Sequence, residues 1–143
     1  IIAGGFRGYG LAAEAAPVAR GILDAASHFV ANRLPELWAG LPREDGSFPV
    51  QYLGANVPQA WAAATVLRLV AVMLGLHAVT DEAGSRLHVD PALPDWLPEL
   101  TLTNLRAGRG SLDLRARGRT VEVLRNDSGF TVVEGPAPGR VPG

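Results

Sequence analysis

The spacing of apolar residues changes at Gly75, and this change constrains the fold more than any other feature of the 143-residue chain. Before Gly75, apolar residues recur at three- and four-residue steps, as between Val18 and Phe29, which predicts amphipathic helices. After it, apolar and polar residues alternate, as in Leu112-Asp113-Leu114, which predicts strands with one buried face. Helices followed by strands predict an α+β fold in which an antiparallel sheet packs on the helical part.

A short helical segment over residues 1–9, with Ile2, Phe6 and Tyr9 at helical spacing, is expected to form a hairpin with the first of two longer helices. The first longer helix covers residues 12–29, and the second covers residues 59–74, with Pro58 at its start and Gly75 at its end. The second longer helix is apolar enough for a membrane span to be considered. Arg68 lies in its middle, where a charge costs about 2.5–3.5 kcal/mol on insertion scales, so a buried helix is the better interpretation and no membrane partner is expected.

These patterns divide the chain into three regions. Residues 1–76 form the helical region, and residues 77–135 form the antiparallel sheet. Residues 136–143 are rich in proline and glycine and are expected to form a flexible tail.

Composition excludes several classes of function. The chain has no cysteine, which excludes disulfides and thiolate chemistry, and its three histidines match no zinc signature, so we expect no metal and no cofactor. The net charge of −1 offers no electrostatic footprint for nucleic acid. No secretory leader is visible, which predicts a cytoplasmic protein.

The region between the two helices, residues 30–57, is the best place for a site. It is rich in turn residues, and a structureless segment of this length inside a small domain is uncommon and usually functional. Glu36 lies in it between Leu34-Pro35 and Leu37-Trp38. Apolar and aromatic neighbours suit a carboxyl group for acid–base chemistry on sugars, but a loop glutamate that accepts backbone hydrogen bonds fits the same spacing.

Aromatic residues in and beside this region offer a second signal. Trp38, Tyr52 and Trp61 could form a platform on which the apolar face of a sugar ring packs. Aromatic residues are also common in cores, and for Trp96, which lies away from the loop and before a predicted strand, the core is the better interpretation. The residues alone leave both interpretations open for Trp61.

Several short motifs, taken in order, resemble the C-terminal end of bacterial glycogen-debranching-enzyme-like proteins, the amylo-α-1,6-glucosidase family. The similarity extends from about Tyr9 to about Val133, and the ordered set is more specific than any one motif. The motifs are Arg33-Leu34-Pro35-Glu36-Leu37-Trp38-Ala39-Gly40, Phe48-Pro49-Val50, Pro58-Gln59-Ala60-Trp61-Ala62-Ala63, Leu87-His88-Val89-Asp90-Pro91 and Pro94-Asp95-Trp96-Leu97-Pro98.

The resemblance implies a fold and an activity. Residues 1–76 would be the last helices of an α/α toroid of the six-hairpin glycosidase type, followed by the small antiparallel β appendage. Glu36 matches the family's late glutamate, which would act as general base in an inverting hydrolysis of α-glucosidic bonds. Trp38, Tyr52, Gln59 and Trp61 would then line the pocket for a carbohydrate substrate.

The resemblance also implies that a part of the site is elsewhere. No residue of this chain matches the family's general-acid aspartate, so the chain by itself should lack catalysis and should need the remainder of the catalytic domain upstream. The alternative is a noncatalytic carbohydrate-binding or interaction domain that uses Trp38 and Trp61. A truncated product without activity, held to a partner by exposed helical faces, is a third possibility.

Overall fold

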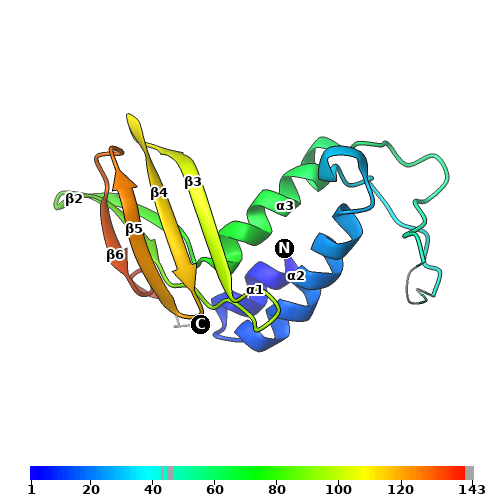
Figure 1. The fold of residues 1–143 in the computed structure, drawn as a ribbon, viewed down its shortest axis with the longest axis horizontal. Helices are drawn as coiled ribbons and strands as arrows, with labels where there is room; N and C mark the ends of the chain where they lie inside the picture. Colours follow the sequence, from blue (N-terminus) through cyan, green and yellow to red (C-terminus); the bar gives the residue numbers. More distant parts are fainter. Residues whose placement is uncertain (43, 45–46, 141–143) are drawn as a thin grey trace. The chain divides into compact units, whose positions relative to one another are not determined.

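The structure is a computed structural model that describes residues 1–42, 44 and 47–140; the last three residues of the predicted tail lie outside this range. Helices precede strands along the chain (Figure 1). The helices are α1 (Ile2–Gly8), α2 (Ala12–Ala26), the 3₁₀ turn η1 (Val30–Asn32) and α3 (Ala60–Met73). The strands are β1 (His77–Asp81), β2 (Gly84–Val89), β3 (Glu99–Ala107), β4 (Gly110–Arg117), β5 (Thr120–Asn126) and β6 (Thr131–Glu134).

The prediction that the chain contains the last helices of an α/α toroid is wrong. The described residues form a small α+β protein with three α-helices and two three-stranded sheets. The first helix, α1, has seven residues, and Gly4, Gly5 and Gly8 make it a poor candidate for a long toroid helix. The apolar spacing in residues 12–29 and 59–74 shows that each helix has a buried face, but it does not specify how many helices pack together.

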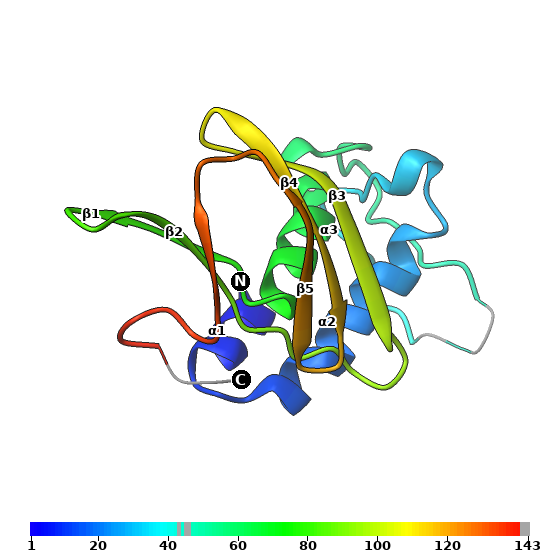
Figure 2. The ribbon, with the colours of Figure 1, turned by 60° about the vertical axis from the view of Figure 1, so that its left-hand side comes forward.

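The six strands form two sheets (Figure 2). One has the order β3-β4-β5 and is antiparallel throughout. The other has the order β1-β2-β6, in which β1 pairs with β2 antiparallel but β6 pairs with β2 in parallel, so the predicted single antiparallel sheet is corrected. A parallel pair needs a long connection, and here β3, β4 and β5 form it.

A hydrophobic core joins the two sheets. Leu87 and Val89 of β2 are buried together with Leu112 and Leu114 of β4. Burying a leucine or valine side chain stabilises a fold by roughly 1.5–3 kcal/mol, so these residues supply much of what holds the sheets together. His88 is also buried, and neither of its ring nitrogens has a hydrogen-bond partner among the described residues, so β2 does not have the solvent-facing side that alternation predicts.

The chain divides into two compact units. Residues 1–16 and 71–143 form the first, called here the sheet unit, and residues 17–70 form the second, called the loop unit. The core between the sheets belongs to the sheet unit, whereas the candidate site residues belong to the loop unit. No helix in the described part of the chain is long and apolar enough to cross a membrane.

A buried ion pair organises the sheet unit. The guanidinium of Arg7 donates to the backbone oxygen of Asp90, to its carboxylate at 3.4 Å, and to the carbonyl of Val72 at 3.3 Å. The side chains of Arg7 and Asp90 are only 10% and 17% exposed. Burial lowers the pKa of Arg7, and the Asp90 carboxylate opposes this shift. A Cβ at Gly75, whose φ is +60°, would collide with the Asp90 carbonyl, so glycine permits this close approach.

We predict that Arg7→Met costs about 3 kcal/mol of unfolding free energy, because it removes a buried guanidinium together with its hydrogen bonds to Asp90 and to the Val72 carbonyl. Urea denaturation followed by circular dichroism measures the loss. Arg20→Met is the matched control, because the ion pair of Arg20 with Asp24 has both side chains more than half exposed and should be worth less than about 1 kcal/mol. Equal losses in the two variants would contradict the role assigned to Arg7.

Candidate functional site

The site segment of the loop unit is ordered by backbone pairing. Residues 34–39 and 50–56, called here the paired arms, run antiparallel to each other through an isolated bridge between Trp38 and Gln51. The backbone N–H of Ala39 donates to Val50 at 2.9 Å, and the N–H of Tyr52 donates to Leu37 at 3.0 Å. The predicted structureless loop therefore contains a short ladder that can hold side chains in place.

Glu36 is fixed across the paired arms by Asn56. Its carboxylate Oε2 accepts hydrogen bonds from the Asn56 side-chain amide at 2.9 Å and from the Asn56 backbone N–H at 3.3 Å. The Glu36 N–H donates in return to the Asn56 carbonyl at 3.0 Å. One bond to the carboxylate thus comes from the backbone, as the structural interpretation of Glu36 predicts. Among the described residues, no hydrogen bond reaches Oε1, so this oxygen can accept one from a ligand.

Glu36, Trp38 and Trp61 line one pocket of about 190 Å³, called here the Glu36 pocket. Trp61 is 65% exposed and Trp38 is 37% exposed, so both rings are accessible to a ligand. Trp38 is held by an edge-to-face contact with Phe29, with ring centroids 5.7 Å apart. The other lining residues are Ile22, Leu34, Pro35, Ala62 and Thr65.

The structure places the other two predicted pocket residues differently. Tyr52 and Gln59 do not line the Glu36 pocket. Their backbone N–H groups instead hold the segment together. The N–H of Tyr52 donates to the Leu37 carbonyl, and the N–H of Gln59 donates to the Leu34 carbonyl at 3.2 Å. Their contact with a substrate stays a prediction, and it would have to occur outside this pocket.

Trp96 lies in the sheet unit between β2 and β3 and is half-buried.

Three residues of the site are missed by the sequence analysis. Ile22 of α2 and Thr65 of α3 line the pocket, and Asn56 holds the Glu36 carboxylate. Asn56 has a local signal, since it stands before a predicted helix, but that signal indicates a helix cap rather than a partner for Glu36. Ile22 is one of several apolar residues of α2 and Thr65 is one of two polar residues of α3, and neither position indicates a ligand site by itself.

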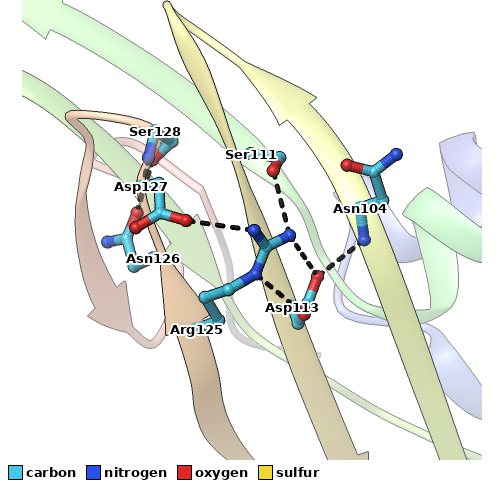
Figure 3. Close-up of polar contacts among 7 residues, drawn as sticks. All are labelled: Asn104, Ser111, Asp113, Arg125, Asn126, Asp127 and Ser128. Carbon is cyan, nitrogen blue, oxygen red and sulfur yellow. Dashed lines mark hydrogen bonds and ion pairs between the residues drawn. The ribbon is translucent and has the colours of Figure 1, made fainter.

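Arg125, on the sheet of β3, β4 and β5, forms a second polar cluster with its neighbours (Figure 3). Arg125 of β5 binds the Asp113 carboxylate with two donors, at 3.1 and 3.2 Å. It also donates to Asp127 and to the Ser111 hydroxyl, both at 3.0 Å. The backbone N–H of Asn104, at a bulge in β3 with φ +56°, donates to Asp113 at 2.7 Å. This cluster therefore joins three strands, and we do not assign an anion site to it.

No group of three or more histidine, aspartate or glutamate side chains in the described part of the chain could hold a metal ion. Comparison of the chain with protein-family models, with curated proteins and with solved structures found no match in any of the three. The resemblance to the debranching family therefore stays an expectation of the sequence. The chemistry of the Glu36 pocket has to be inferred from the residues that line it.

The Arg125 cluster predicts a pH dependence of stability. The hydrogen bonds from Arg125, with that from Asn104, hold the pKa of Asp113 below its ordinary value. A carboxylate with a lowered pKa stabilises the fold above its unfolded pKa, and this contribution is lost as the pH falls through the lower, folded pKa. We expect Asp113→Asn and Arg125→Gln to lose less stability than the unmodified chain between pH 6 and pH 2.5. Urea midpoints measured at both pH values test this. If both variants lose as much stability between the two pH values as the unmodified chain does, the prediction is contradicted.

Proposed function

We propose that this chain binds carbohydrate in the Glu36 pocket. One observation carries the proposal: a carboxylate and two accessible tryptophan rings, which are 23 residues apart in sequence between Trp38 and Trp61, line the same small pocket. Pyranose rings have apolar C–H faces that pack on aromatic rings, and their hydroxyl groups donate hydrogen bonds to carboxylates. The Glu36 pocket offers both kinds of contact.

The size of the pocket suits a single ring. A closed cavity of about 150 Å³ holds benzene, and the pocket of about 190 Å³ is open to solvent beside the exposed Trp61, so a sugar ring can pack against its walls without being fully enclosed. The fixed Oε2 of Glu36 keeps Oε1 in place, which lowers the conformational entropy that ligand binding has to offset. The resemblance to α-glucosidases makes α-glucosides the first ligands to test.

A second candidate function is catalytic, with Glu36 as the general base of a glycoside hydrolase. The observation that favours it is the same free Oε1, because a base must present an unoccupied oxygen to water. An inverting glycosidase also needs an acid about 6.5–9.5 Å from the base, and Glu36 is the single carboxylate among the described residues that line the pocket. The acid would have to come from the remainder of a catalytic domain, so binding is the better-supported proposal. The cytoplasmic location stays a prediction of the sequence.

We predict that Trp61→Ala weakens binding of methyl α-glucoside and maltose at least about 10-fold, because truncating a tryptophan that anchors a ligand costs on the order of 2 kcal/mol. Isothermal titration calorimetry measures the affinity. Leu53→Ala is the matched control, because Leu53 is 93% exposed in the same unit and does not line the pocket. Unchanged affinity in Trp61→Ala, or absence of any sugar binding to the unmodified chain, would contradict the proposal.

The catalytic candidate makes a separate prediction. If the chain hydrolyses α-glucosides, Glu36→Gln should lower kcat about 100- to 10,000-fold, the usual contribution of a general base. Glucose release from maltotriose measures turnover, and Asn56→Ala should lower it less because it frees Glu36 without removing it. Hydrolysis that survives Glu36→Gln would exclude Glu36 as the base. Binding without hydrolysis by the unmodified chain would leave the noncatalytic proposal as the better one.

A further inference from the structure

A second cavity adjoins the Glu36 pocket within the loop unit. It has a volume of about 270 Å³ and is called here the apolar pocket. Ile22 and Trp38 line both cavities, so the two lie against the same side chains. The remaining lining residues are Gly21, Ala25, Ala39, Leu41, Pro42, Ser47, Phe48, Pro49 and Val50.

The walls of the apolar pocket differ in chemistry from those of the Glu36 pocket. The Ser47 hydroxyl and the Trp38 indole N–H are the polar side-chain groups among the described lining residues, and none of these residues carries a charged side chain. Leu41, Phe48 and Val50 are 64%, 55% and 49% exposed, so a ligand could remove much apolar surface from water. No carboxylate is present there to accept from sugar hydroxyl groups, whereas an apolar group can pack on the exposed apolar side chains.

Aromatic contacts hold the wall between the two cavities. The ring of Phe29 lies 5.4 Å from that of Phe48 and 5.7 Å from that of Trp38, and Phe48 also contacts His28 edge-to-face at 5.7 Å. The side chains that would touch both halves of a ligand are therefore positioned by one cluster. A pocket formed before the ligand arrives loses less entropy on binding.

We infer that the apolar pocket holds the aglycone of a glycoside whose sugar ring occupies the Glu36 pocket, and that this aglycone is an aromatic ring or a short alkyl chain. The inference rests on the proposed function. Each cavity alone is smaller than the roughly 300–1,000 Å³ typical of ligand sites, and the two together reach that range. Ile22 and Trp38 are the side chains that such a ligand would contact from both cavities.

The experiment compares three ligands on the full chain by calorimetry: methyl α-glucoside, phenyl α-glucoside and octyl α-glucoside below its micelle concentration. The sugar is the same, so differences report the aglycone. Phenyl and octyl α-glucoside should bind at least about 10-fold more tightly than methyl α-glucoside, as expected for burial of an aromatic ring or several methylene groups.

Two variants test whether the higher affinity for phenyl and octyl α-glucoside arises in the apolar pocket. A Cβ at Gly21 meets no atom within 4 Å, so Gly21→Leu should fill the apolar pocket without a collision and should also favour the helix. It should abolish the gain from phenyl and octyl groups while the affinity for methyl α-glucoside stays the same. Leu41→Asp places a charge in another part of the lining of the apolar pocket and should lower the gain in affinity from the phenyl and octyl groups. Leu53→Asp, outside both cavities, should leave that gain unchanged.

The outcomes separate this inference from the proposed function. If no glucoside binds, the proposed function fails. If methyl α-glucoside binds but the phenyl and octyl groups add nothing, the proposed function stands and the aglycone inference is overturned. If the gain in affinity from the phenyl and octyl groups survives Gly21→Leu, the inference is also overturned. It is overturned as well if sedimentation shows that the chain self-associates and that Leu41→Asp abolishes this, because a second copy would then cover the pocket.

Discussion

The ion pair between Arg7 and Asp90 is the constraint on which the sheet unit depends. A buried charge stabilises a fold only when it is paired and hydrogen-bonded, and the Arg7 guanidinium donates from Nε to the carbonyl of Val72 and from Nη2 to the backbone oxygen and the carboxylate of Asp90. One side chain thereby joins α1, the last turn of α3 and the end of β2. The backbone N–H of Asp90 also donates to Leu74 at 3.1 Å, so strand β2 enters the core at a fixed position relative to the end of α3.

In the loop unit, the pair of Glu36 and Asn56 fixes two chain segments relative to each other. Glu36 and Asn56 exchange hydrogen bonds through both backbone and side chain, and the bonds of the paired arms continue from them. A segment of this length would otherwise lose much conformational entropy on ordering. Pairing the arms offsets that loss, and it leaves Trp38 on an edge of the segment where Phe29 can hold it. The rigidity that a binding site needs is thus built from backbone bonds between the two arms, such as those of Glu36 with Asn56 and of Ala39 with Val50.

The sequence predicts elements well where local spacing decides them. Alternation around Leu112 and Leu114 indicates β4, and both residues are buried in the core. The same rule fails at His88, because both faces of β2 are covered and alternation cannot reveal this. The toroid prediction fails for a related reason. The spacing of apolar residues shows that a helix has a buried face, but it does not show which elements pack against that face. The contact of Glu36 with Asn56, and the meeting of Ile22 with Thr65 at one pocket, depend on long-range pairing that no local pattern encodes.

The exposure of Trp38, Phe48 and Trp61 supports the proposal that the loop unit binds a ligand. Large apolar side chains left in water contribute little to folding, yet Phe29 holds the rings of Trp38 and Phe48, which are 37% and 55% exposed, and Trp61 is 65% exposed. A core would cover them, and a surface without a ligand would gain solubility from polar residues in their place. Glu36 is the one carboxylate among the described residues that line the pocket, and no hydrogen bond from those residues reaches its Oε1, so the site keeps both an apolar wall and a hydrogen-bond acceptor open to solvent. A ligand with an apolar ring face and hydroxyl groups at its edge, as proposed above, would contact both.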